Sequence, residues 1–381
     1  MKIRLASREQ CTGCSACSKV CPSNAISMRP DAEGFLVPVV DPVLCVECGV
    51  CVRTCPVINP LLPGNQPATV YAAIHQNDLV REKSSSGGVF SALAEHVLAE
   101  DGVVFGAAFD QDMVVQHIAI STIAELDKLR GSKYVQSDLK NTFVEAKHHL
   151  QSGEKVLFCG TPCQIAGLKK FLKKNYSKLV CIDFICHGVP SPFTWRSYLD
   201  SLPLKRPDFV SFRDKTSGWH NFQIVLGASS SGPSLREKFS DNYYMKAFLA
   251  DFGLRKSCYA CKFKGGHSGS DITIGDFWGV ELLCPELDDD KGISVAFIHT
   301  EEGDKLFKNA PLNRFKIDVA TATKHNSPYY ASVKATLFRS WFFKKVKQGQ
   351  FSCIVSRINR TRKWRHFFLR VRGKVKRMLR K

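Results

Sequence analysis

Two cysteine runs near the N-terminus constrain the fold more than any other feature of the 381-residue sequence. Each run has the spacing C-x2-C-x2-C-x3-C followed by proline, so the spacing of the cysteines and the proline is the same in both runs. The runs consist of Cys11, Cys14, Cys17 and Cys21, and of Cys45, Cys48, Cys51 and Cys55. Three thiolates this close together can bind three irons of one [4Fe–4S] cluster from a single loop, so the fourth ligand comes from elsewhere.

This spacing is typical of bacterial ferredoxins with two clusters, in which the last cysteine of each run binds the cluster of the other run. We therefore assign Cys11, Cys14, Cys17 and Cys55 to one cluster, and Cys45, Cys48, Cys51 and Cys21 to the other. Structural zinc is the alternative, because four-cysteine zinc sites also use C-x2-C pairs. Zinc sites rarely use a triple run followed by proline, so the pattern favours two iron–sulfur clusters.

The remaining composition indicates a folded protein of a reducing compartment. The sequence has 16 cysteines, 44% hydrophobic residues and 23% charged residues. Its N-terminus lacks the apolar core of a secretory signal, and no apolar run approaches the roughly 20 residues that span a bilayer. Thiols in the cytosol stay reduced and serve metal or redox chemistry rather than disulfides. We therefore expect a cytoplasmic protein.

Proline and glycine punctuation from Pro60 to Pro67 indicates a linker, and beyond it strands and helices alternate. Strands are expected over 70–74, 103–109, 155–159 and 179–185, helices over 87–99 and 164–173, and a hairpin tip at 229–233. This order predicts an α/β body whose site lies on loops at strand ends. We expect an α+β ferredoxin-like domain over 1–65, a body over 66–335 (parts of about 66–150 and 151–335), and a helical tail over 336–381.

Six short segments of the body resemble one protein family, in the same order along the chain. They are Ser84–Phe90, Gly131–Tyr134, Gly160–Gln164, Cys186–Pro190, Cys258–Cys261 and Asp271–Asp276. As a set they are similar to the coenzyme F-420 hydrogenase/dehydrogenase beta-subunit family, which includes the plant 7-hydroxymethyl chlorophyll a reductase. The resemblance covers about residues 66–310 and implies an oxidoreductase with FAD and iron–sulfur clusters. Electrons would pass between the ferredoxin clusters and FAD, and so to or from an organic or deazaflavin-like substrate.

The segment from Ser84 to Gly88 is the main candidate for flavin binding. It precedes an amphipathic helix, so free backbone N–H groups and the positive helix end lie beside three hydroxyls, an arrangement that suits a phosphate. A capped helix with glycines needed for packing is the alternative. With the resemblance, the expected flavin-binding residues are Ser85, Ser86, Gly87, Gly88, Ser132, Lys133, Tyr134 and Thr161.

Four further cysteines suggest a third cluster. Cys163 lies between a strand and a helix, Cys186 ends the next strand, and Cys258 with Cys261 forms a C-x2-C pair. The resemblance implies that these four hold a third [4Fe–4S] cluster close to the flavin. One zinc site or scattered buried thiols are the alternatives.

His187 is the candidate catalytic residue, because an imidazole beside the flavin can donate a proton near neutral pH. A hydrogen bond to backbone or sulfur is the alternative role. The hydrogenase subunit lacks the ferredoxin module and the His-Gly-Val-Pro that follows Cys186, which puts the deazaflavin substrate in doubt. Other interpretations are an electron-transfer adaptor subunit without a substrate, and a basic regulatory protein with redox-sensing clusters.

The positive charge is concentrated at the C-terminus. Of the net charge of +19, residues 339–381 contribute 16 Lys or Arg and no Asp or Glu, which leaves +3 for the rest. Apolar residues at helical spacing follow from Trp364 to Met378, with Lys and Arg between them. Such a helix suits an anionic membrane surface at the inner face or an acidic protein partner, and nucleic acid is less favoured. The other expected partner is a redox protein or a small-molecule electron acceptor.

Overall fold

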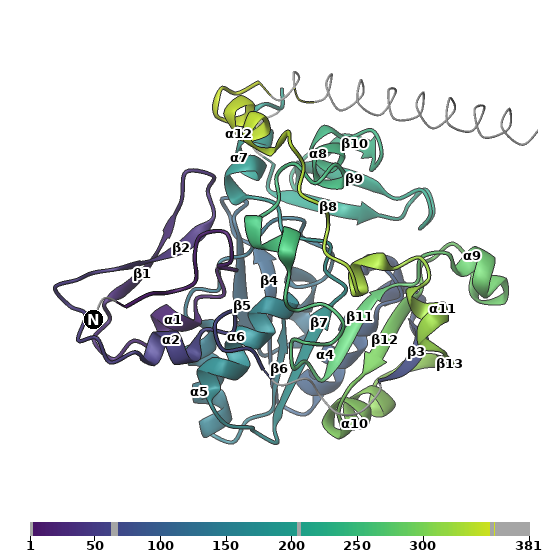
Figure 1. The fold of residues 1–381 in the computed structure, drawn as a ribbon. Helices are drawn as coiled ribbons and strands as arrows, with labels where there is room; N and C mark the ends of the chain where they lie inside the picture. Colours follow the sequence, from purple (N-terminus) through teal and green to yellow (C-terminus); the bar gives the residue numbers. More distant parts are fainter. Residues whose placement is uncertain (1–2, 62–67, 204–206, 351–353, 355–381) are drawn as a thin grey trace, which may run out of the picture.

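The computed structural model describes residues 3–61, 68–203, 207–350 and residue 354. Figure 1 shows a small N-terminal module beside an eight-stranded sheet, with a three-stranded sheet above it. Most of the linker expected between Pro60 and Pro67 lies outside the described residues. None of the helices in the described ranges combines the length and apolar character needed to cross a membrane.

The N-terminal module consists of two short helices and one hairpin: α1 (Ala16–Lys19), β1 (Ile26–Pro30), β2 (Leu36–Val40) and α2 (Val50–Thr54). β1 and β2 pair antiparallel, with Ile26 opposite Val40. Each helix begins inside a cysteine run, after a residue in the left-handed region, Ser15 at φ 60° and Gly49 at φ 69°. These left-handed residues turn the chain sharply, so the cysteines of one run lie around a single loop.

The large sheet is mixed, with the strand order β13-β3-β12-β11-β7-β6-β4-β5. Its strands are β3 (Thr69–His75), β4 (Val103–Phe109), β5 (Val115–Ile120), β6 (Val156–Cys159), β7 (Leu179–Phe184), β11 (Ile272–Asp276), β12 (Ser294–Ile298) and β13 (Leu312–Ile317). The four central strands β11, β7, β6 and β4 run parallel, and the others pair antiparallel. The expected α/β body is confirmed.

Helices bury both faces of the large sheet. Leu157 of β6 packs in a core with α4 (Val89–Ala99) and α10 (Glu301–Asn309), whereas Val156 and Phe158 pack with α5 (Thr142–Gln151) and α6 (Pro162–Leu172). Because successive side chains of a strand point to opposite faces, a parallel strand covered on both sides is apolar throughout. The uninterrupted apolar run of β6 follows from this arrangement.

The three-stranded sheet has the order β10-β9-β8. We name this sheet, together with the helices that share its core, the third layer. Its strands are β8 (Phe209–Asp214), β9 (Gln223–Ala228) and β10 (Gly232–Lys238), and the tip expected at 229–233 joins the last two. α7 (Pro192–Asp200) and α8 (Tyr243–Leu249) share a core with this sheet. The remaining elements are α3 (Asp78–Lys83), α9 (Val280–Leu283), α11 (Val319–Thr323), and the 3-10 turns η1 (Ile123–Lys128), η2 (Lys256–Ala260), η3 (Pro285–Leu287) and η4 (Ser327–Tyr329).

The beginning of the expected tail is part of the folded body. α12 (Arg339–Lys347) buries Phe342, Phe343 and Val346 in the core of the third layer, where Phe343 meets Phe35 of the N-terminal module edge to face. The basic composition of the segment did not indicate that these apolar residues are buried, although helical spacing places them on one face. The apolar stripe from Trp364 to Met378 lies outside the described residues.

An ion pair also joins α12 to the N-terminal module. Arg339 donates from both terminal nitrogens to the carboxylate of Glu33, at 2.7 and 2.6 Å, and it also donates to the carbonyl of Leu254. Both side chains are largely buried. The module is therefore fixed to the body at its hairpin.

We expect Arg339→Met to destabilise the docked module by about 3–5 kcal/mol, because the Glu33 carboxylate would stay buried without a partner. Denaturant unfolding and limited proteolysis of the holoprotein measure the effect. Lys344→Met on the same helix is the control, since Lys344 is exposed and its loss should change stability by less than about 0.5 kcal/mol. Equal stability of the two variants would contradict the stabilising role of the ion pair between Arg339 and Glu33.

Candidate functional site

The main cavity lies at the carboxyl ends of the central parallel strands and has a volume of about 550 Å³. Its wall includes Gly160 after β6, Cys186 after β7 and Asp276 at the end of β11. Open α/β sheets bind ligands in this position. Among the expected site residues, the cavity is lined by Ser85, Ser86, Gly88, Ser132, Lys133, Tyr134, Thr161, Cys186 and His187.

The serine hydroxyls beside α4 are mostly engaged within the protein. Ser84 Oγ donates to the carbonyl of Val80 at 2.8 Å, and Ser86 Oγ donates to that of Ile293 at 2.7 Å. Ser85 Oγ accepts from the backbone nitrogen and the hydroxyl of Ser132, at 2.7 and 3.0 Å. Ser85 therefore keeps its own proton for a ligand, together with the first N–H groups of α4, which no preceding turn satisfies.

The two glycines of this loop have different surroundings. A Cβ at Gly87 would collide with the carbonyl oxygen of Ala73 and lie 2.7 Å from the backbone nitrogen of Ser294. Gly87 is thus required where the loop crosses β3 and β12, and it does not line the cavity. Gly88 lines the cavity and has φ +87°, the left-handed region that favours glycine. The packing explanation accounts for Gly87. It also applies to Gly88, because a Cβ there would lie 2.9 Å from the Cβ of His75, although Gly88 itself lines the cavity.

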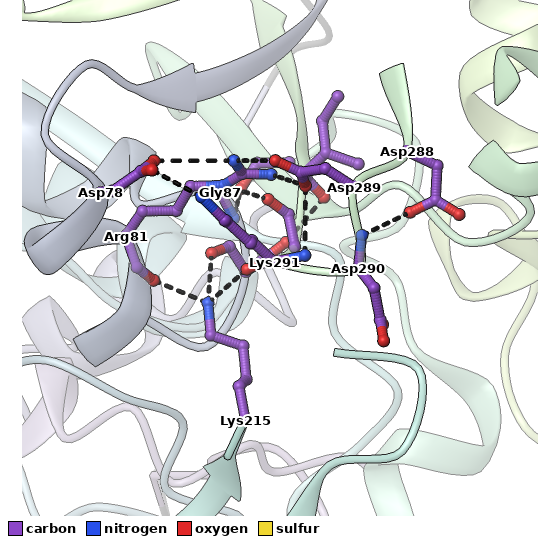
Figure 2. Close-up of polar contacts among 12 residues, drawn as sticks. Asp78, Arg81, Gly87, Lys215, Asp288, Asp289, Asp290 and Lys291 are labelled. Atoms are coloured by element: carbon purple, nitrogen blue, oxygen red, sulfur yellow. Dashed lines mark hydrogen bonds and ion pairs between the residues drawn. The ribbon is translucent and has the colours of Figure 1, made fainter. Parts of the chain in front are cut away.

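A polar clamp holds the outer side of the serine loop (Figure 2). Lys215 Nζ donates to the carbonyls of Arg81, Ser86 and Lys291, at 2.6, 3.1 and 2.7 Å. The buried Arg81 guanidinium binds both carboxylate oxygens of Asp289, at 2.7 and 2.5 Å. These residues come from three distant parts of the sequence, so no local pattern indicated them. Together they fix the backbone that precedes α4.

The other expected flavin-binding residues also have internal partners. The Lys133 ammonium donates to the carbonyls of residues 128, 129 and 130, at 3.2, 2.9 and 2.8 Å, and burial lowers its pKa to about 7. The backbone nitrogen of Thr161 donates to Gln164 Oε1, and its hydroxyl lies 3.2 Å from Cys163 Sγ. A contact between the Lys133 ammonium and a phosphate stays a prediction. A phosphate in this position would have to compete with the three carbonyls for the ammonium.

Arg213 and aromatic side chains form another part of the wall, which the sequence did not indicate. Arg213 is buried, contacts Asp276 at 3.1 and 3.2 Å, and donates to the Tyr134 hydroxyl at 3.2 Å. Its guanidinium carbon lies 3.8 Å from the ring centroid of Phe222. This part of the wall, together with Trp278, offers flat apolar surfaces to a planar ligand.

His117 of β5 is a buried cavity residue that stays neutral at pH 7. Its Nε2 lies 3.0 Å from the carbonyl of Cys159 and must donate to it, because a carbonyl only accepts. Burial lowers the pKa of His117 to about 4. The sequence did not indicate this side chain either, since a lone histidine on a strand has no distinctive spacing.

We expect His117 to make folding stability fall as the pH is lowered from 6.5 towards 4. The unfolded imidazole takes up a proton in this window while the folded one does not, which costs about 2 kcal/mol between pH 7 and pH 5. Denaturant unfolding of the wild type and of His117→Phe at several pH values measures it. His75→Phe serves as the comparison variant. If folding stability depended on pH equally in the wild type and in His117→Phe, the assignment of the effect to His117 would be refuted.

His187 lies on the cavity wall directly after Cys186. Its Nε2 is 2.6 Å from Asp251 Oδ1, and its ring meets Phe248 at a centroid distance of 5.0 Å. The carboxylate fixes the ring orientation and favours a proton on Nε2. A catalytic role for His187 stays a prediction.

The cysteines of the N-terminal module form two groups. Cys21, Cys45, Cys48 and Cys51 line one small hollow; we name them the outer group, since Cys48 is exposed. Burial raises the pKa of Cys17, and so do the nearby charges of Cys14, Cys11 and Cys55 and, least, that of Cys51 of the outer group. We name Cys11, Cys14, Cys17 and Cys55 the inner group. The groups contain the cysteines of the crossed assignment, and which sulfur binds which cluster stays a prediction.

Four cysteines of the body form the body group, Cys163, Cys186, Cys258 and Cys261. Burial raises the pKa of Cys163 well above its usual value, and the charges of the other three act in the same direction. Cys163 and Cys261 pack on the buried residues Val57, Ala166 and Phe263, as does Cys55 of the inner group. The inner and body groups are therefore separated by one small apolar cluster.

Fold, cysteine groups and family models together define the class: this is an iron–sulfur electron-transfer protein. The model for the C-terminal part of the coenzyme F-420 hydrogenase/dehydrogenase beta subunit matches residues 153–324, and the model for its N-terminal part matches residues 70–143. A 4Fe-4S dicluster domain matches residues 10–59. The chain belongs to the coenzyme F-420 hydrogenase/dehydrogenase beta-subunit family, with a dicluster domain in front.

Two of the relatives come from methanogens. The chain is 22% identical to one subunit of the F(420)H(2) dehydrogenase of Methanosarcina mazei, over 47% of this chain and 55% of that protein. It is 24% identical to the coenzyme F-420-dependent sulfite reductase of Methanocaldococcus jannaschii, over 79% and 46%. The chain thus spans about half the length of these two relatives. A chain of the F-420-reducing [NiFe] hydrogenase complex from Methanosarcina barkeri matches with a TM-score of 0.47 and 16% identity, over 81% of this chain and 96% of that one.

Proposed function

We propose that the protein is an iron–sulfur flavoprotein oxidoreductase that passes electrons between ferredoxin-type [4Fe–4S] clusters and FAD, and so to or from an organic or deazaflavin-like substrate. One observation carries the proposal: Cys186 belongs to the body group and also lines the main cavity. A cluster held by this group would therefore border the place where a ligand binds. The proposed units are a ferredoxin domain over 1–65, a body over 66–335 and a tail over 336–381.

The burial of the cysteine groups supports an order for electron transfer. Cys48 of the outer group is exposed, whereas Cys14 of the inner group packs so closely on α6 that a Cβ at Gly167 would lie 2.8 Å from its Cβ. The same helix begins beside Cys163 of the body group. The proposed path runs from a partner to the outer cluster, then to the inner cluster, the body cluster and the cavity.

The residues around the cavity fit FAD in size and chemistry. A volume of about 550 Å³ lies in the range of cofactor pockets, which extends over about 300–1,000 Å³. The Ser85 hydroxyl and the start of α4 offer donors for a phosphate, and Phe222 and Trp278 offer surfaces for a planar ring. When bound, FAD supplies the exchange of single electrons with clusters and of electron pairs with an organic molecule.

His187 is the proposed proton donor at the cavity wall. The Asp251 carboxylate holds its ring, so that a proton on the imidazole can be delivered to a group bound in the cavity. Arg213 and the aromatic side chain of Phe222 form a further part of the same wall. The proposed substrate class is organic or deazaflavin-like electron acceptors.

An electron-transfer subunit without its own substrate is the second candidate, since the M. mazei relative is itself named as a subunit. Reduction of a small organic acceptor by the isolated chain would exclude this candidate. A redox partner protein is proposed in either case. Residues 339–381, apart from the buried side chains of α12, are proposed to contact an anionic membrane surface or an acidic protein, at a cytoplasmic location.

The deciding experiment is cofactor analysis of anaerobically purified protein. The proposal expects about twelve iron atoms per chain, from three four-iron clusters, and one FAD released on denaturation. Cys21→Ser tests the crossed ligation, and spectroscopy should show damage to the outer cluster rather than the inner one. A preparation that contains iron but releases no flavin would exclude the flavoprotein and leave the electron-transfer subunit, the second candidate.

A further inference from the structure

Four arginines are buried among the described residues, and one of them lacks a carboxylate partner. Arg81, Arg213 and Arg339 each pair with an acidic residue. Arg255 is 2% exposed and makes no ion pair within the described part of the chain. An arginine keeps its charge at every pH that proteins meet, and a buried charge without compensation costs several kcal/mol. Something else must therefore supply negative charge beside Arg255.

The contacts of Arg255 lead to the inner cysteine group. Its Nε donates to the carbonyl of Cys11 at 2.7 Å, and Nη2 lies 3.6 Å from Cys11 Sγ. The other contacts are neutral oxygens, the Leu36 carbonyl at 2.9 Å and Gln136 Oε1 at 2.9 Å. A cysteine thiolate and the cluster it binds are the anions within reach of this guanidinium.

Arg255 also lies next to the body cysteine group. It caps the 3-10 turn η2, and the backbone nitrogen of Cys258 donates to its carbonyl at 3.0 Å. Arg255 is thus bonded through its side chain to Cys11 of the inner group and through its backbone to Cys258 of the body group.

We propose that Arg255 is the shared counter-ion of the inner and body clusters and raises the reduction potential of both. The inference rests on the proposed function, because it requires clusters in both groups. A cluster gains negative charge when it takes up an electron, so a nearby cation and a hydrogen bond to its sulfur favour the reduced form. The electron that leaves the outer cluster then reduces the inner cluster, with no atom transferred.

The test is a potentiometric titration of each cluster in the anaerobic holoprotein, followed by electron paramagnetic resonance. In Arg255→Gln we expect the reduction of the inner cluster to become at least tenfold less favourable, a shift of about 59 mV to more negative potential for one electron. The body cluster should shift in the same direction, and the outer cluster should keep its potential. An unchanged inner potential, or an equal shift of the outer cluster, would overturn the inference.

Three variants separate charge from packing. Gln136→Leu removes a neutral contact of Arg255 and a hydrogen bond to the Thr12 carbonyl, while the guanidinium charge stays. It should shift the inner potential less than Arg255→Gln does; an equal shift would assign the effect to packing and overturn the inference. Lys256→Gln removes a cation paired with Glu9 at the surface and should shift nothing. Lys264→Met removes a cation bonded to the Cys186 carbonyl and should shift the body cluster alone.

If Arg255→Gln loses iron, Arg255→Lys carries the test. The shorter ammonium cannot reach the Cys11 sulfur and both carbonyls together, so the inner potential should still fall, and by less than with glutamine. A wild-type potential in this variant would overturn the inference. Failure of the proposed function is seen separately, because wild-type protein would then lack the signals of three clusters before any substitution is made.

Discussion

Replacing both Cys258 and Cys261 by serine should lower the iron content from about twelve to about eight atoms per chain, because one four-iron cluster loses two of its four thiolates. The two ferredoxin clusters should keep their spectra, since their cysteines lie in the separate N-terminal module. Transfer of electrons to an acceptor in the cavity should stop, as the body group is the one that reaches the cavity wall at Cys186. Iron analysis and reduction kinetics measure both effects.

Cys159→Ser is the matched control for this pair. Cys159 is half-buried and lines the same cavity, but it is not a member of the body group. It should retain about twelve irons and full electron transfer. Unchanged iron in the double variant would show that Cys258 and Cys261 bind no metal, and the third cluster would have to be abandoned.

Gly88→Val should release FAD while the ferredoxin clusters stay intact. Gly88 has φ +87° and lines the cavity, and a Cβ there would lie 2.9 Å from the Cβ of His75, so a branched side chain would strain the backbone and displace the loop that offers its N–H groups to a ligand at the start of α4. Strain of this kind costs about 1–3 kcal/mol, and a tenfold loss of affinity corresponds to about 1.4 kcal/mol. Flavin fluorescence and far-ultraviolet circular dichroism, measured on the same sample, give occupancy and folding.

Gly87→Ala distinguishes loss of the ligand from loss of the fold. Its Cβ would meet backbone atoms of β3 and β12 rather than the cavity, so flavin loss in this variant should follow unfolding of the body. In Gly88→Val, flavin loss should occur at temperatures where the helical signal is unchanged. A folded Gly88→Val protein with full FAD would place the phosphate elsewhere and remove the serine loop from the site.

Local patterns predicted the parts of the molecule that depend on neighbours in sequence. The run from Val103 to Phe109 is a strand with the expected bounds, because its apolar residues face helices on both sides of the sheet. The cysteine spacing likewise placed three members of each group on one loop, since the left-handed Ser15 and Gly49 turn the chain there. Short-range geometry of this kind leaves a readable signature.

Long-range contacts could not be predicted from one sequence. Lys215, Arg81 and Asp289 meet around the serine loop although they come from distant parts of the chain. The cavity was therefore expected without its clamp, without Arg213 and without His117. The basic count after residue 339 also hid a helix whose Phe342 and Phe343 are core residues, because a charge total says nothing about where apolar side chains point.

The fixed attachment of the N-terminal module has a consequence for the timing of turnover. Glu33 is held by Arg339, and Cys14 lies directly against α6, so the module has no hinge in the described structure about which it could swing towards the cavity. Electron carriers that move between two docking positions are limited by that diffusion. In the proposed relay the spacing of the clusters is therefore set at folding, and turnover need not wait for the module to move.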